Sequence, residues 1–149
     1  MQFSEETSYV LRRAGWTENY RGDIEKYRQI YKNENTLMPP KVGEFLERFG
    51  GLKVESKHHR SRFLIDPGRL PGFFSRGMQR MSRIVGKPLY PIGGGGGDVG
   101  YYMDEGGNVY EDMLEPEIYH IGNTGEEAIE ALFTDQPYLA TISDPMFTE

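Results

Sequence analysis

The sequence lacks cysteine entirely, and residues 88–149 contain neither lysine nor arginine. Without cysteine the chain can have no disulfide, no iron–sulfur site, no thiol nucleophile and no cysteine-ligated zinc. It also lacks any apolar run near the roughly 18 residues of a membrane helix, and residues 1–15 contain no signal-peptide core. We therefore expect a cytoplasmic chain that makes no membrane contact.

What is present indicates one folded domain. The length of 149 residues is typical of a single domain, and a hydrophobic content of 37% with 13% aromatics argues against disorder. We expect one domain over residues 1–149, with its core at about 4–133. The C-terminal tail at 134–149 has no clear pattern.

Charge is distributed very unevenly along the chain. In residues 1–87, 17 bases against ten acids give +7, whereas residues 88–149 carry thirteen acids and a charge of −13, which accounts for the total of −6. Two explanations remain open at this point. Either the halves neutralise each other across the folded surface, or the asymmetry serves a charged partner.

Capping residues and apolar spacing predict five helices, followed or interrupted by strands. The helices are expected at residues 4–15, 23–31, 39–50, 73–85 and 124–133. Alternating apolar residues predict strands at 52–54, 62–66, 89–92, 99–103, 109–110 and 118–121. The segments at 99–103 and 109–110 form a hairpin around a glycine-containing turn.

The predicted helix at 73–85 has an apolar face and a basic row. The apolar face is expected from Phe74, Met78, Met81 and Val85. The basic row, two positions further on and therefore opposite, comprises Arg76, Arg80, Arg83 and Lys87. A solvated outer face is the simpler interpretation, and a phosphate-binding row is the alternative.

No motif predicts catalysis. The five glycines Gly93–Gly97 fit a dinucleotide-binding pattern only loosely, since a strand follows them where such a site needs a helix, so we expect a flexible loop. His58 and His59 are adjacent and would point to opposite faces of a strand, which disfavours a metal site. The acids between Asp104 and Glu117 fit a solvated hairpin better than a glycosidase pair. We therefore expect no enzyme activity, catalytic residue, cofactor or metal.

Charge also bears on the kind of partner. Five basic residues could form a nucleic-acid patch, but the acidic half would repel phosphates, so we expect no direct nucleic-acid binding. They are Lys57, Arg60, Arg62, Arg69 and Arg76. The acidic half better suits a basic protein that itself acts on nucleic acid.

Five short motifs, in order, resemble the third immunity-protein branch of the SUKH superfamily. They are Ala14-Gly15-Trp16 with Arg21, Phe45-Leu46 with Phe49-Gly50-Gly51-Leu52, Leu89 to Gly93, the hairpin from Tyr102-Met103-Asp104 to Gly107-Asn108-Val109-Tyr110, and Ile121-Gly122 before the last helix. From the residues themselves we expect Trp16 in the core and Arg21 paired with an acid.

The resemblance implies an α+β domain in which helices flank a mostly antiparallel sheet. It also implies a non-catalytic immunity protein that binds and neutralises a polymorphic toxin, often a nuclease or deaminase domain, in the cytoplasm. The alternative is a regulatory or scaffold protein of the same fold that binds an endogenous protein.

The acidic half then supplies a hypothesis for the contact surface. We expect it to be centred on the hairpin and the glycine loop, and to occlude a basic toxin sterically and electrostatically. The residues expected to contact the partner are Asp98, Tyr101, Asp104, Glu105, Glu111 and Asp112.

Overall fold

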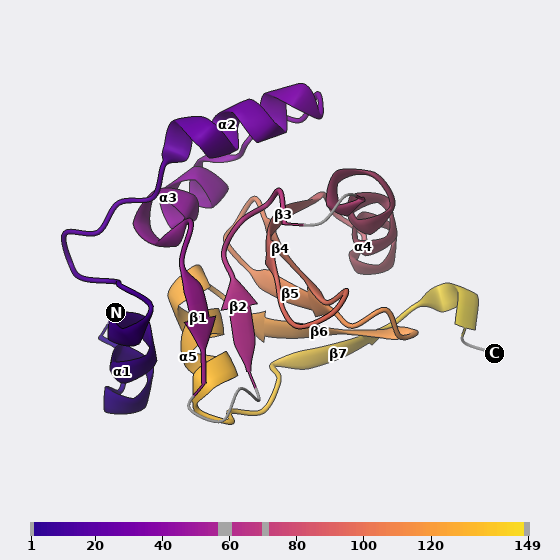
Figure 1. Cartoon of the computed structure of the whole chain (residues 1–149). Helices are drawn as coiled ribbons and strands as arrows, with labels where there is room; N and C mark the ends of the chain where they lie inside the picture. Colours follow the sequence, from indigo (N-terminus) through magenta and orange to yellow (C-terminus); the bar gives the residue numbers. More distant parts are fainter. Residues whose placement is uncertain (1, 57–60, 70–71, 148–149) are drawn as a thin grey trace.

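The computed structural model describes residues 2–56, 61–69 and 72–147. Within them, an antiparallel sheet of seven strands runs in sequence order, flanked by helices, which confirms the predicted α+β fold (Figure 1). The strands are β1 (Lys53–Glu55), β2 (Arg62–Leu64), β3 (Leu89–Gly94), β4 (Gly100–Asp104), β5 (Val109–Asp112), β6 (Glu117–Gly122) and β7 (Ala140–Ser143). The helices are α1 (Glu5–Arg13), α2 (Ile24–Asn33), α3 (Pro40–Phe49), the π-helical turn η1 (Phe73–Gly77), α4 (Met78–Val85), α5 (Gly125–Phe133) and the 3-10 turn η2 (Pro145–Phe147).

Three of the helices begin at the N-cap residues that the sequence predicts. The side chains of Ser4, Asp23 and Thr124 each accept a hydrogen bond from the backbone N–H three residues ahead, at 3.1–3.3 Å. These bonds satisfy N–H groups that have no partner inside a helix. The starts of α1, α2 and α5 are therefore fixed by local chemistry.

The sheet separates two hydrophobic cores. Helices α1, α2, α3 and α5 cover the larger core on one face, and η1 with α4 covers the smaller core on the other (Figure 1). Side chains alternate between these faces along each strand. In β4, Tyr101 and Met103 enter the larger core, whereas Tyr102 enters the smaller one. The alternation decides which polar residues face α4.

Two expectations about the first motif have different outcomes. Trp16 is buried in the larger core, stacks on Phe49 and donates a hydrogen bond from Nε1 to the carbonyl of Arg48, as predicted for a core residue. In the part of the chain that the structure describes, Arg21 pairs with no acid, so that prediction is wrong. Arg21 donates instead to backbone carbonyls of the preceding turn, including that of Tyr20 at 2.7 Å.

The glycine run belongs partly to the sheet. Gly93 and Gly94 lie in β3, so the prediction of a loop over all five glycines is wrong for these two. A Cβ at Gly93 would lie 2.2 Å from the carbonyl oxygen of Leu64, so β2 approaches β3 closely only because this position has no side chain. The loop itself covers residues 95–99.

The C-terminal segment contributes a strand that the sequence pattern does not predict. Residues Ala140–Ser143 form β7, which pairs with β6 and ends the sheet. Four residues without strict alternation carry little signal of their own, and β6 supplies the pairing. The chain therefore remains part of the fold beyond residue 134.

Candidate functional site

The six residues predicted to contact a partner do not lie on one surface. Asp98 is exposed in the β3–β4 loop and Glu105 is exposed in the β4–β5 turn, so these two acids lie at opposite ends of β4. The other four are buried, with 2–5% of each residue exposed: Tyr101, Asp104, Glu111 and Asp112. Contact of any of the six with a partner stays a prediction.

Tyr101 and Glu111 face the larger core side of the sheet. The Tyr101 hydroxyl donates to Glu111 Oε2 at 2.9 Å, and the Tyr138 hydroxyl donates to Oε1 at 3.3 Å. Burial raises the pKa of Glu111, although both hydrogen bonds act in the opposite direction. Both oxygens of this carboxylate are therefore engaged within the chain.

Asp104 faces the other side and closes the β4–β5 turn. Its Oδ2 lies 2.7 Å from Lys87 Nζ, and it accepts hydrogen bonds from the backbone and side-chain nitrogens of Asn108, both at 2.9 Å. Burial alone would raise the pKa of Asp104, but the hydrogen bonds from Lys87 and Asn108 outweigh it and lower the pKa. Asp104 thus has a role within the fold.

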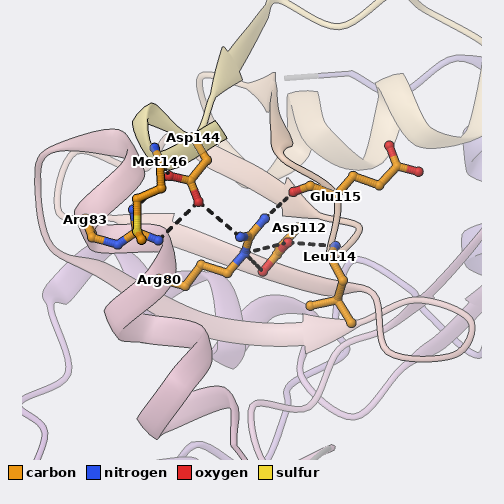
Figure 2. Close-up of polar contacts among 7 residues, drawn as sticks. All are labelled: Arg80, Arg83, Asp112, Leu114, Glu115, Asp144 and Met146. Carbon is orange, nitrogen blue, oxygen red and sulfur yellow. Dashed lines mark hydrogen bonds and ion pairs between the residues drawn. The ribbon is translucent and has the colours of Figure 1, made fainter. Parts of the chain in front are cut away.

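Asp112 belongs to an ion network between α4 and the last strands (Figure 2). Arg80 Nε lies 3.3 and 3.4 Å from the two oxygens of Asp112, and its Nη1 lies 3.4 Å from Asp144 Oδ2. Its Nη2 donates to the carbonyl of Glu115. Arg83 donates twice to Asp144, at 2.8 and 3.1 Å. One arginine thus joins β5 to the segment after β7.

Asp144 connects β7 to α4. Only 1% of it is exposed, and it follows the last residue of the strand. Its hydrogen bonds from Arg83 and from the backbone N–H of Met146 lower its pKa to about 2. The carboxylate therefore stays ionised at neutral pH and holds the C-terminal end of the sheet against α4.

These contacts account for part of the charge asymmetry. Ion pairs join the basic half to the acidic half, so internal neutralisation accounts for several of the acids. The pairs are Arg48–Glu126, Arg80–Asp112, Arg80–Asp144, Arg83–Asp144 and Lys87–Asp104. The basic row is exposed at Arg83 and Lys87, as expected of a solvated face, but these two residues and the half-buried Arg80 also form these ion pairs.

Exposed side chains gather around this network. Leu114 is 59% exposed and Met146 is 76% exposed; the backbone N–H of Leu114 is bound by Asp112, and that of Met146 by Asp144 (Figure 2). We call these two residues, with the nearby exposed acids, the loop-end surface. The acids are Asp98, Glu115 and Glu117. An apolar pair, Met113-Leu114, inside an acidic stretch is the sequence signal that points to it.

The described residues contain neither a metal site nor a membrane-spanning helix. Among the described residues, no group of three or more His, Asp or Glu side chains is placed to hold a metal ion. Nor does any helix in that part of the chain combine the length and apolar character needed to cross a membrane. His58 and His59, with the basic Lys57 and Arg60, lie outside the described residues.

The architecture is that of an α+β domain built on an antiparallel sheet in sequence order. The family model described as SUKH-3 immunity protein matches residues 3–135. The chain therefore belongs to the SUKH-3 immunity protein family, in agreement with the motifs in its sequence. A search of curated proteins and a search of solved structures each found no match.

Proposed function

We propose that this protein binds and neutralises a cognate polymorphic toxin, a nuclease or deaminase domain, in the cytoplasm of the cell that produces both. It blocks the toxin by occlusion and performs no chemistry of its own. Membership of an immunity protein family supports the role. The acids left exposed in residues 88–149 suit the basic surface of an enzyme that acts on nucleic acid.

The loop-end surface carries this proposal. Leu114 and Met146 expose apolar area beside Asp98, Glu115 and Glu117, so apolar anchors lie among acids as in a protein–protein interface. Asp112 and Asp144, the carboxylates of the ion network, accept hydrogen bonds from the backbone N–H groups of Leu114 and Met146 and so fix the backbone of both apolar residues. A surface fixed before binding loses less conformational entropy when the partner binds.

The six residues predicted from the sequence divide among three roles in this proposal. Asp98 and Glu105 are exposed and can touch the toxin directly, although only Asp98 lies at the loop end. Asp112 holds the backbone of Leu114, so its effect on binding is indirect. Tyr101, Asp104 and Glu111 support the sheet from which the loops emerge.

The test uses a candidate toxin domain sought among the genes next to this one, with its catalytic residue inactivated, in a calorimetric titration. Leu114→Asn removes the apolar side chain at a backbone position with φ 63°, a conformation that asparagine tolerates. We expect affinity to fall roughly tenfold, as for the loss of an interface anchor. The matched control is Leu37→Asn, at a 91% exposed leucine between α2 and α3, which should leave affinity unchanged.

A second arm measures electrostatics and protection. Asp98→Asn with Glu115→Gln should weaken binding and reduce its dependence on salt. Cells that express the active toxin should survive with the wild-type chain. If the wild-type chain neither binds this toxin nor protects cells, the proposed function is wrong, and stable association with an endogenous protein would then favour a regulatory or scaffold role.

A further inference from the structure

A pocket opens between the η1–α4 helix and strands β4 and β5. Its volume is about 670 Å³. Tyr102 lines it from β4, while Ser75, Arg76 and Arg80 line it from the helix and Leu114 from the β5–β6 loop. The pocket therefore adjoins the loop-end surface at Leu114.

Tyr102 contributes a hydroxyl group to the lining of this pocket. Only 2% of the residue is exposed, yet its hydroxyl makes no hydrogen bond with any described residue. Two other buried tyrosines are paired within the chain: Tyr31 donates to the carbonyl of Pro91 at 2.6 Å, and Tyr101 donates to Glu111 at 2.9 Å. Tyr27, like Tyr102, forms no hydrogen bond through its hydroxyl with a described residue. Among the described residues no buried side-chain nitrogen or oxygen lacks a partner, so the Tyr102 hydroxyl is accessible from the pocket and can bond a ligand there.

The backbone around this hydroxyl is shaped to admit it. A Cβ at Gly77 would lie 2.0 Å from Tyr102 Oη, and one at Gly100 would lie 3.2 Å from it. Phe73 packs against the Tyr102 ring with centroids 5.9 Å apart and fixes its position. Burial raises the pKa of Tyr102 well above its ordinary value, so the hydroxyl remains protonated and can donate.

Hydrogen-bond donors predominate among the unused polar groups around the pocket. Arg76 is exposed and forms no ion pair or hydrogen bond with a described residue. The three nitrogens of Arg80 donate to Asp112, Asp144 and the Glu115 carbonyl. Because a guanidinium has five N–H groups, Arg80 can still donate to a ligand. Together with the Tyr102 hydroxyl, these groups call for an acceptor that carries negative charge.

The acids at the pocket select among such acceptors. Asp112 already accepts from Arg80 and from the Leu114 backbone, while Asp98, which also lines the pocket, is exposed and pairs with no described residue. Two nearby carboxylates repel a doubly charged phosphate more strongly than a singly charged group. A carboxylate, planar and able to accept from a guanidinium and a hydroxyl together, fits the donors better.

We propose that this pocket receives a carboxylate of the toxin, from an Asp or Glu side chain or a carboxyl terminus, through Arg76 and the Tyr102 hydroxyl. The inference rests on the proposed function and adds a specific anchor to it. A pocket that offers hydrogen-bond donors beside acids would fix the orientation of a basic partner, because one acidic group of that partner must enter it.

The experiment compares Tyr102→Phe with Tyr31→Phe in titrations with the inactivated candidate toxin domain used to test the proposed function. Tyr102→Phe removes no hydrogen bond within the described chain, so stability should be retained while affinity falls roughly tenfold. Tyr31→Phe removes the bond to Pro91 and should lower stability without changing affinity. Arg76→Gln should weaken binding to a similar extent.

A double-mutant cycle then identifies the carboxylate. Acids on the toxin surface are replaced one at a time by their amides, and one of them should lose affinity in the wild-type chain but not in the Tyr102→Phe variant. If both pocket variants bind within twofold of wild type, or if no toxin carboxylate couples to Tyr102, the pocket proposal is wrong while toxin binding stands. If the wild-type chain does not bind the toxin, both proposals fail.

Discussion

The position of the Tyr102 hydroxyl can be tested through Gly77. In an ordinary helix interior, Gly→Ala stabilises a protein by roughly 0.5–1 kcal/mol, because alanine has less conformational freedom to lose. Here the new Cβ would lie 2.0 Å from Tyr102 Oη and 3.1 Å from its Cζ. Overpacking of this kind costs about 1–3 kcal/mol. We therefore expect Gly77→Ala to lower the free energy of unfolding by about 1–2 kcal/mol.

The assay is equilibrium unfolding in urea, followed by the fluorescence of Trp16. This residue is the sole tryptophan of the chain and is only 7% exposed, so its emission reports loss of the larger core. A loss of 1–2 kcal/mol corresponds to a fall in melting temperature of about 2–8 °C for a chain of this size. Circular dichroism provides the second probe for a two-state transition.

Two further variants serve as controls for this experiment. Gly43→Ala makes the same change in α3, where the new Cβ meets only Met38 Sδ at 3.5 Å, and it should leave stability unchanged or raise it. Gly77→Ala in the Tyr102→Phe background should recover at least half of the loss, because the clashing oxygen is gone. A Gly77→Ala protein as stable as wild type would refute the placement of the hydroxyl.

Two predictions concern titrating groups. Asp144→Asn should lower the free energy of unfolding at pH 7 and speed hydrogen exchange in β7. The pKa of Asp144 falls from 3.8 in the unfolded chain to about 2 in the fold, so its carboxylate stabilises the fold only while it is ionised. The difference in unfolding free energy between the variant and wild type should therefore shrink as pH falls from about 4 to 2. Urea titrations across this range measure it, and a pH-independent difference would argue against the ion pairs with Arg80 and Arg83. Glu111→Gln should raise the melting temperature at pH 7, because burial raises the pKa of Glu111 and the ionised form therefore destabilises the fold. The gain should vanish as pH drops below the unfolded value of 4.5, and equal melting temperatures at pH 7 would contradict the argument.

The candidate site could be predicted from the sequence only in part. Glu111 and Asp112 are neighbours in a predicted strand, so alternation alone already indicates that they face opposite sides of the sheet. Charge counting placed both on one acidic surface, although Glu111 binds Tyr101 and Asp112 binds Arg80. Counting charges along a chain takes no account of which face each residue occupies.

The sequence by itself determined the helices, most strands and the family. Caps such as Ser4 and Thr124 act within three residues, and the family motifs are likewise local in the chain. Only the tertiary structure decided that Arg80 meets Asp112 and Asp144, which lie 32 and 64 residues away, and that the Tyr102 hydroxyl lies beside Gly77. Such pairings depend on strand register and on the docking of α4, which arise from packing of the whole chain and leave no periodic trace in its sequence.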